Sequence, residues 1–443
     1  MHSPQQPEPN AMERITRAAV PVFLLLSIVT LAFGLGFLVN EMVTDSGSST
    51  TETPAPVASG NGAIAEDSVG VAILNEIFDI LRTQHVDRDL ISEDRFRQAA
   101  IDGILNSLND PNTEYLTPEQ VESGAFDLSS TYQGIGASVS DATGQVTIVA
   151  PFRDSPAEQA GIRAGDIILE VDGVSTEGWT DQQAVQEIRG PAGTDVTLTV
   201  QRTDGTIDDV TVTRGTILIQ SVFDEPFFEL IPGETGDQLV DRDGNPADNI
   251  AYIHIAQFHD QTLGELRELL ADIENGDYVG LIVDVRNNPG GLLSATVDVT
   301  DEFLEEGIIL SEVDGAGNER SWSANAGGVA TSIPIVVLQN GGSASGAEVI
   351  AAALRDNNRA VVVGERSFGK GSVNQLRHLE NCGDPDGCGA LYLSVGRWLT
   401  PDGKQIEGTG VAPNVEVELT EDDYILHGDL QVFEAVDILL GNQ

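Results

Sequence analysis

The pattern of apolar and polar positions changes character twice along the folded part of the chain. Between residues 67 and 108, apolar residues recur at three- and four-residue spacing, which predicts amphipathic helices. From 131 to 214 the pattern shortens to brief runs such as DIILEVDG and DVTLTVQR, which indicate β-strands. From 249 onward, apolar runs alternate with helical segments. This order predicts an α/β layer with a largely parallel sheet.

The apolar runs of this last part are typical of buried strands. They are NIAYIHIAQF, VGLIVDVR, IPIVVLQN and RAVVVGE, and helical segments follow the first three. In such folds ligands bind beyond the carboxyl ends of the strands. Functional residues are therefore expected in the turns that follow these runs.

An apolar stretch near the N-terminus predicts a membrane anchor. Residues 18–39 are uncharged and mostly apolar, which is enough for a helix that crosses ~30 Å of hydrocarbon. Arg14 and Arg17 precede this stretch and Glu41 and Asp45 follow it, so the N-terminus is expected in the cytoplasm. A cleaved signal peptide is the alternative, although its apolar core is usually only ~7–15 residues. The sequence predicts a single-pass protein of the cell membrane in which everything after residue 40 is extracytoplasmic.

Composition narrows the classes of partner. The formal net charge of -49 comes from 71 acidic and 22 basic residues, and no basic stripe is visible, so nucleic acid is not expected as a partner.

Residues 44–66 are rich in Ser, Thr, Pro and Gly and predict a flexible linker. Cys382 and Cys388 flank a short turn and would close a small disulfide outside the cytoplasm. His254 and His259 have no carboxylate pattern that suggests zinc, and no metal or other cofactor is predicted.

Lys370 stands out because arginine supplies almost all the positive charge. Only Lys370 and Lys404 are lysines. The segment GERSFGKGS resembles a phosphate-binding loop, but Gly371 stands where that motif needs Ser or Thr. Ser367 and Lys370 also spell the S-x-x-K of penicillin-binding proteins, although Gly369 disfavours the helix that this arrangement needs. The third interpretation is a general base. A lysine buried among apolar neighbours without a carboxylate partner can lose its proton near neutral pH, and an arginine cannot.

The serine that would accompany such a base lies in QNGGSASGAEV. A predicted strand runs into a Gly/Ser turn, and a helix begins near Ser345, where the helix N-terminus favours developing negative charge. Ser345 and Glu348 also match a capping box, which needs no catalysis. Ser343 could equally be the nucleophile or a turn residue.

The segment VDVRNNPGGLL follows another predicted strand. Asp284 and Arg286 are expected to pair with one another or with neighbours. Gly290 and Gly291 would let backbone N–H groups approach a ligand closely, as an oxyanion hole requires. A tight turn between strand and helix is the alternative.

Together, these segments resemble the carboxy-terminal processing peptidases, or tail-specific proteases, which are Ser-Lys endopeptidases with an inserted PDZ domain. The resemblance runs from about residue 70 to 440. It rests on NDPNTEYL, GIGASV, SPAEQAGIRAGDIILEVDG, DVRNNPGGLL, GGSASGAEVIAAALRD, VGERSFGKGSV and GRWLTPDGKQIEGTGVAPNVEV, which occur in the family's order.

The resemblance implies roles for individual residues. Ser345 would be the nucleophile and Lys370 the general base, and the backbone of Gly346 and of the Gly290–Gly291 turn would form the oxyanion hole. Four residues after the lysine the family usually has a glutamine that orients it, whereas this chain has Asn374. Because asparagine is one methylene shorter, that hydrogen bond is expected to be weaker or to come from elsewhere.

The resemblance also implies the fold and the mode of substrate binding. The expected fold is an α/β, Clp-protease or crotonase-like core with an inserted PDZ domain and one N-terminal transmembrane helix. The PDZ loop would hold a substrate's terminal carboxylate through the backbone N–H groups of Gly134, Ile135, Gly136 and Ala137, while the peptide adds a strand to the sheet edge. The expected divisions are 1–17 cytoplasmic, 18–39 transmembrane, 40–66 linker, 67–127 helical part, 128–214 PDZ domain and 215–443 peptidase core.

The sequence therefore predicts a membrane-anchored serine endopeptidase that acts on proteins with free C-termini, and it leaves room for a homo-oligomer. Two alternatives belong to other classes. One is a catalytically silent PDZ scaffold that presents peptides at the membrane, which intact Ser345 and Lys370 disfavour. The other is a nucleotide-binding protein that uses the loop 364–371, which Gly371 disfavours.

Overall fold

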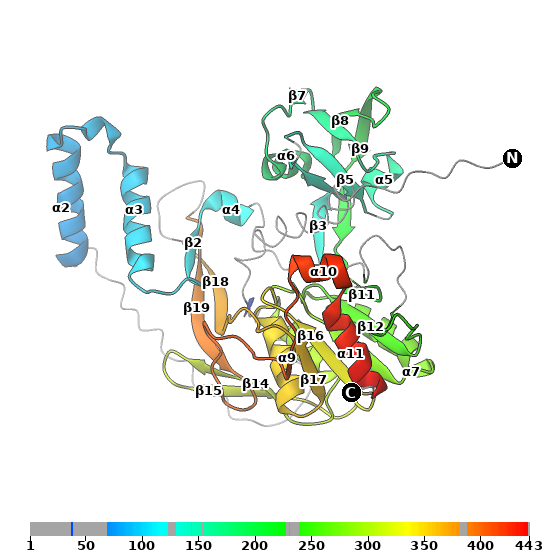
Figure 1. Ribbon diagram of the computed structural model, residues 1–443. Coiled ribbons are helices and arrows are strands. Elements are labelled where there is room, and N and C mark those ends of the chain that lie inside the picture. The colour runs from blue at the N-terminus through cyan, green and yellow to red at the C-terminus, as the bar shows by residue number, and fades with distance from the viewer. Residues whose placement is uncertain are drawn as a thin grey trace.

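The computed structural model describes residues 37–38, 69–122, 130–142, 144–152, 154–226, 230, 239–380 and 388–441. Figure 1 shows three parts in these residues: a helical arm, a small β domain and a larger α/β body. The arm consists of α2 (Val69–Gln84), the short helix η1 (Arg88–Leu90) and α3 (Glu93–Asn106). The two long helices confirm the helical periodicity of this region.

The α/β body is built on a six-stranded sheet. Its spatial order is β11 (Val222–Phe223), β12 (Ile250–Ile255), β13 (Gly280–Asp284), β16 (Ile335–Gln339), β17 (Ala360–Gly364) and β20 (Val415–Glu416). All neighbours pair in parallel except β11 with β12. The predicted largely parallel sheet is confirmed.

Helices cover both faces of this sheet, because alternate residues of each strand point to opposite sides. On one face, Ile253, Val283 and Val337 pack with α7 (Thr262–Asn275), α8 (Leu293–Asp301) and α9 (Gly346–Asp356). On the other face the apolar residues of the same strands pack with α11 (Leu430–Leu440), which follows α10 (Glu421–His427). His254 is 2% exposed on β12, as expected for a core histidine.

A second sheet lies beside the body. Its order is β1 (Phe37–Leu38), β18 (Ser372–His378), β19 (Ala390–Leu399), β14 (Ile308–Asp314) and β15 (Glu319–Ser323), and β2 (Glu114–Leu116) also pairs with β19. The short helix α4 (Pro118–Glu122) follows β2. Because β18 begins two residues after Lys370, this sheet fixes the segment that carries the lysine.

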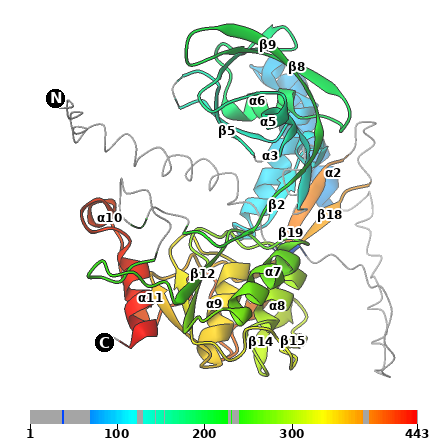
Figure 2. The same cartoon turned by 90° about the vertical axis from the view of Figure 1, so that its right-hand side faces the viewer.

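The small β domain has a core of its own. Its sheet runs in the order β4 (Ala137–Ser140), β5 (Thr147–Pro151), β6 (Ile167–Val171), β8 (Asp195–Gln201) and β9 (Ile207–Thr213), and β7 (Val174–Ser175) pairs with β6. The helices α5 (Pro156–Gln159) and α6 (Asp181–Ile188) complete it. The paired strands β3 (Thr131–Gly134) and β10 (Gly215–Leu218) connect it to the body (Figure 2). All of these elements lie within the range 128–214 predicted for the PDZ domain, except β10.

The predicted membrane anchor lies almost entirely outside the described residues. Of residues 18–39, only Phe37 and Leu38 are described, and they form strand β1 rather than the end of a helix, because they pair in parallel with Val373 and Asn374 of β18. Among the described residues, no helix is both long and apolar enough to cross a membrane. The predicted linker 40–66 and the cytoplasmic residues 1–17 also lie outside the described residues.

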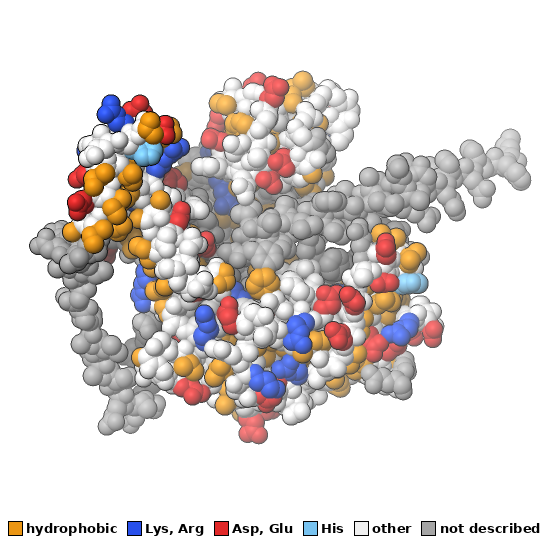
Figure 3. Space-filling view, turned by 60° about the vertical axis from the view of Figure 1, so that its left-hand side comes forward, with side chains coloured by type: hydrophobic (Ala, Val, Ile, Leu, Met, Phe, Trp, Pro, Cys, Tyr) orange, Lys and Arg blue, Asp and Glu red, His pale blue; other side chains and the backbone are white. Residues whose placement is uncertain are grey.

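The helical arm exposes large apolar side chains. Figure 3 shows them gathered on the arm at the upper left, and they include Ile73, Ile77 and Ile80 of α2 and Ile104 of α3. Phe78 and Phe96 connect the two helices, with ring centroids 4.5 Å apart.

Candidate active site

Ser345 lies at a sharp corner between β16 and α9. Its φ is 53°, a left-handed conformation that is uncommon for a residue other than glycine. The residue is fully buried, and among the described residues no group shares a hydrogen bond with its Oγ. A buried hydroxyl without a hydrogen-bond partner lowers the stability of the fold. The corner therefore keeps this oxygen available for chemistry at some expense of stability.

The capping-box alternative is only half present. Oε2 of Glu348 accepts a 2.8 Å hydrogen bond from the backbone N–H of Ser345, as such a box requires. The reciprocal bond to the serine Oγ is absent among the described residues. Glu348 therefore holds the backbone of Ser345 and leaves its side chain unused.

Ser343 is a turn residue in this structure. Its Oγ donates a 2.8 Å hydrogen bond to the carbonyl of Val285 and accepts a 2.9 Å bond from the N–H of Asn340. These bonds connect the turn after β16 to the segment after β13. Of the two serines left open by the sequence, Ser345 is the one whose hydroxyl is unoccupied.

The carboxylate of Glu348 connects the serine corner to the lysine loop. Besides the Ser345 N–H, it accepts hydrogen bonds from Ser367 Oγ at 2.5 Å, from the N–H of Gly369 at 2.7 Å and from the N–H of Lys370 at 2.8 Å. Burial raises the pKa of Glu348 to about 7, although these hydrogen bonds act in the opposite direction. One buried side chain thus fixes both backbones.

Lys370 lies in the irregular loop between β17 and β18 and is 5% exposed. This loop has no helix, which agrees with the argument against an S-x-x-K site. The Nζ lies 5.7 Å from the ring centroid of Tyr392. Burial lowers the pKa of Lys370 to about 8, which leaves a usable neutral fraction near physiological pH.

The expectation that Lys370 lacks carboxylate neighbours is wrong. Four carboxylates oppose the effect of burial and raise the lysine pKa, in decreasing order Glu114, Glu407, Asp110 and Glu348. The sequence could not reveal them, because they come from separate segments that meet only in the folded chain.

Asn374 does not occupy the position expected of a lysine-orienting residue. Its Nδ2 donates to the carbonyl of Asn112 at 2.7 Å and to Ser394 Oγ at 3.1 Å, and its Oδ1 accepts from Ser372 Oγ at 2.9 Å. Within the described part of the chain, no hydrogen bond joins this amide to Lys370. Asn374 instead connects β18 to the segment that leads into β2.

The turn after β13 lies directly against the serine corner. A Cβ on Gly290, whose φ is 102°, would lie 2.7 Å from the Cβ of Ser345 and 2.9 Å from the backbone nitrogen of Gly346. The N–H of Gly290 itself donates to Asn288 Oδ1 at 2.7 Å. At Gly291, a Cβ would lie 1.9 Å from the carbonyl oxygen of Phe258. Only glycine fits at both positions.

A buried ion pair immediately precedes this turn in the chain. Arg286 donates to both carboxylate oxygens of Asp284 and pairs with Asp429 at 2.8 Å, and the hydroxyl of Tyr252 donates to Asp284 at 2.5 Å. Burial raises the pKa of Asp284, but the charge and hydrogen bonds of Arg286 outweigh it and hold that pKa below its usual value. The predicted pairing of Asp284 with Arg286 is confirmed.

Comparison with known proteins identifies the family. The family model described as peptidase family S41 matches residues 249–417, and a PDZ domain model matches residues 147–202. A carboxy-terminal-processing protease of Bartonella bacilliformis is 35% identical over 356 residues, which is 79% of this chain and 75% of that protein. The carboxy-terminal processing protease CtpA of Bacillus subtilis is 32% identical over 348 residues, 79% of this chain and 69% of its own.

The chain belongs to peptidase family S41, the carboxy-terminal processing proteases. Among solved structures, the photosystem II D1 C-terminal processing protease is 27% identical, with a TM-score of 0.43 and coverage of 78% of this chain and 88% of that one. The matches to the S41 family model and to the two protease relatives confirm the predicted resemblance and the predicted serine-type peptidase.

In the PDZ domain of this S41 peptidase, β4 is the terminal strand of the sheet formed by the described residues. Gly136, in the turn before β4, has a φ of 74°, and a Cβ there would lie 2.6 Å from the Cβ of Ser155. Ile135 is buried in the domain core, where Ala184 and Ile188 of α6 also pack. The loop 134–137 thus leads directly into an edge strand beside α6.

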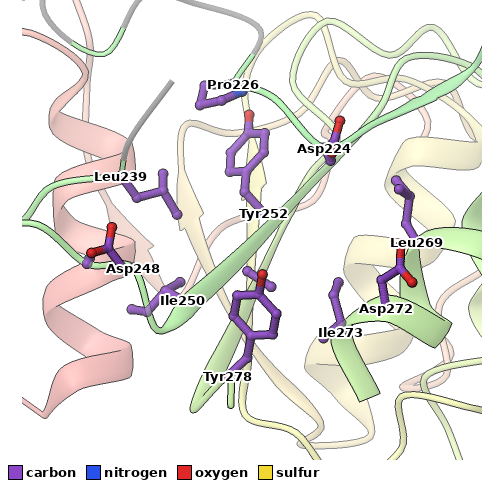
Figure 4. Close-up of a pocket in the computed structure, with 12 residues that line it drawn as sticks. Asp224, Pro226, Leu239, Asp248, Ile250, Tyr252, Leu269, Asp272, Ile273 and Tyr278 are labelled. Atoms are coloured by element: carbon purple, nitrogen blue, oxygen red, sulfur yellow. The ribbon is translucent and has the colours of Figure 1, made fainter. Parts of the chain in front are cut away.

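A cavity of about 350 Å³ lies apart from Ser345 and Lys370 in this peptidase. Figure 4 shows the side chains of Tyr252, Tyr278, Asp224 and Asp272 among those that line this cavity. None of its lining residues is a predicted site residue. The cavity therefore does not belong to the Ser345 site.

The sequence predicts Ser345 and Lys370 as site residues but gives no sign that one carboxylate connects their backbones. In the sequence Glu348 fits a helix cap, and its three-residue spacing from Ser345 indicates a bond to the serine backbone. Its contacts with Ser367, Gly369 and Lys370 left no signal in the spacing.

Proposed function

We propose that this S41 peptidase is a membrane-anchored endopeptidase that recognises substrate C-termini through its PDZ domain and cleaves by a Ser345–Lys370 acyl-enzyme mechanism. The observation that carries the proposal is the corner at Ser345, where the buried Oγ is unpaired among the described residues and the backbone N–H shares the Glu348 carboxylate with the N–H of Lys370. A buried lysine whose pKa is lowered to about 8 is suited to take a proton from such a serine.

The first step forms the acyl-enzyme. Neutral Lys370 takes the proton of the Ser345 hydroxyl as the oxygen attacks the substrate carbonyl carbon, and the resulting ammonium then protonates the leaving amine as the C–N bond breaks. In the second step water attacks the ester, Lys370 takes a proton from that water, and the Ser345 oxygen leaves with a proton. The lysine ends neutral, as it began.

Negative charge on the carbonyl oxygen would be stabilised at the N-terminus of α9. The N–H of Gly346 lies in the first turn of this helix, where no intrahelical acceptor exists. Gly291 would supply a second N–H, and Gly290 the space between them. The existing bond from Gly290 to Asn288 favours Gly291 over Gly290 as the donor.

The decisive experiment compares the two serines of the corner. The full chain is incubated with an unfolded protein that has a free C-terminus, and fragments are measured by mass spectrometry. Ser345→Ala should abolish cleavage, whereas the matched Ser343→Ala should retain it. A Ser345→Ala protein that still cleaves would exclude the mechanism. A wild-type protein that binds C-terminal peptides without cleaving them would favour the silent scaffold.

Membrane anchoring rests on the apolar stretch 18–39 and the charges around it. A protease added outside intact spheroplasts should remove the peptidase part. Digestion only after lysis would exclude an extracytoplasmic site.

A further inference from the structure

Of the four carboxylates that raise the pKa of Lys370, Glu114 contributes most, and the proposed reaction does not otherwise use it. Hydrogen bonds engage the other three. Glu348 accepts from the backbones of Ser345, Gly369 and Lys370, Glu407 from Asn112 Nδ2 and Gly371 N–H, and Asp110 from Thr113 Oγ1 and Asn112 N–H. Among the described residues, the Glu114 side chain makes no hydrogen bond and no ion pair within 4 Å.

The strand pairing places Glu114 on the lysine side of the second sheet. In the antiparallel pair of β2 and β19, Glu114 is opposite Tyr392. Residues directly opposite in such a pair point to the same face. Since the Nζ of Lys370 lies 5.7 Å from the ring centroid of Tyr392, the carboxylate, the ring and the amine share one face.

We propose that Glu114 is a positioning residue that faces Lys370 beside Tyr392, directs its amine and stabilises the ammonium formed when it takes the Ser345 proton. This rests on the proposed Ser345–Lys370 function. Glu114 takes no proton itself, since the proton passes from Ser345 Oγ to Lys370 Nζ and on to the leaving amine. The role is the one that the expected glutamine would have filled and that Asn374, bonded to Asn112, Ser372 and Ser394, does not.

The charges around both groups agree with this pairing. Burial raises the pKa of Glu114, and Lys370 is the charge that lowers it. The other charged groups that act on the lysine are Glu407, Asp110 and Glu348, and Arg397 of β19 lies 4.0 Å from Glu407. Removing the Glu114 charge should therefore make Lys370 easier to deprotonate while the remaining groups keep their partners.

The kinetic test is the pH profile of Glu114→Gln in the full chain. Without the carboxylate, the acid limb of kcat/KM should move to lower pH, and kcat at the optimum should fall on the order of tenfold, with KM unchanged, because one favourable charge interaction is lost. Glu114→Asp keeps the charge and should keep the acid limb in place. Tyr115→Phe is the matched control on the same strand, since it removes the hydrogen bond to the Cys388 carbonyl and no charge.

A second measurement observes Lys370 without any turnover. Because the chain has only two lysines, ¹⁵N or ¹³C labelling of lysine gives two side-chain signals, and Lys370→Arg assigns them. Lys404 pairs with Asp402 at an exposed site and is the internal reference. In Glu114→Gln, the titration of the Lys370 signal should move to lower pH while that of Lys404 stays fixed.

The outcomes separate this proposal from the proposed function. If wild type is active, Ser345→Ala is inactive, and Glu114→Gln leaves both the acid limb and the Lys370 titration unmoved, the role of Glu114 is wrong and the dyad stands. If Ser345→Ala is active, the dyad itself fails. A Glu114→Gln protein that loses activity with an unshifted Lys370 titration would indicate a structural role for β2 and would likewise exclude the positioning role.

Discussion

Oε2 of Glu348 accepts a 2.8 Å hydrogen bond from the backbone N–H of Lys370, 22 residues further along the chain. The same oxygen accepts the N–H of Ser345, also at 2.8 Å. The distance between the proposed nucleophile and its base is therefore set by one carboxylate rather than by a direct bond between them. Because both donors are backbone groups, their side chains stay free for chemistry.

Glu348→Gln should disconnect the two segments. An amide has one acceptor oxygen and directs N–H groups at donors, so at least one buried N–H loses its partner, at a cost of about 1–3 kcal/mol in unfolding free energy. The displaced lysine should lower kcat/KM roughly a hundredfold. Urea unfolding and peptide cleavage measure the two effects. Glu268→Gln, at an exposed position of α7, is the matched control and should change neither.

Lys370→Met should inactivate the enzyme and stabilise it at neutral pH. The folded-state pKa of about 8 lies below the ordinary 10.5, so the folded chain disfavours the ammonium, and stability rises as pH increases from about 8 to 10.5. Below about pH 8, Lys370→Met removes the free-energy cost of the buried ammonium, and the gain in unfolding free energy is up to about 3 kcal/mol.

Urea unfolding at pH 7 and at pH 10 checks the prediction, because the advantage of Lys370→Met should shrink at the higher pH. Lys404→Met is the control and should leave stability unchanged, since its side chain is 65% exposed. Equal stability of wild type and Lys370→Met at pH 7 would contradict the assigned effect of burial.

Much of the body was predictable because its strands are continuous apolar runs. VGLIVDVR and IPIVVLQN became the buried strands β13 and β16, and the turns after them carry Gly290, Gly291 and Ser345. The approach of Glu114 to Lys370 was not predictable, because it depends on β2 joining a sheet with a strand more than 250 residues later. The hydrogen bonds of Asn374 were not predictable for the same reason, since its side chain donates to the carbonyl of Asn112 in a distant segment and not to Lys370. Contacts of this kind follow from tertiary packing and leave no local pattern.

Gly290→Ala should remove activity by steric contact with the nucleophile. The new methyl group would lie 2.7 Å from the Cβ of Ser345, so either the turn or the serine must move. A loss of on the order of a hundredfold or more in kcat/KM is expected, as when an oxyanion-hole donor is removed. The matched control is Gly327→Ala, whose φ of 112° is similar but whose Cβ would meet nothing within 4 Å. It should cost only the strain of the left-handed backbone, about 1–2 kcal/mol, and retain activity.

Recognition of the substrate C-terminus should depend on the PDZ loop. Carboxylate capture by backbone N–H groups requires a free terminal carboxylate, so a substrate with an amidated C-terminus should show a raised KM and a similar kcat. In the protein, Gly136→Ala should have the same effect on the unmodified substrate, because its methyl group would lie 2.6 Å from the Cβ of Ser155 and distort the loop. Gly144→Ala shares the left-handed backbone, with a φ of 80°, but would meet nothing within 4 Å, and it should leave KM unchanged. Acid and amide substrates cleaved with equal KM would show that this loop does not read the carboxylate. A Gly136→Ala protein that still distinguishes the two substrates would place the recognition elsewhere in the chain.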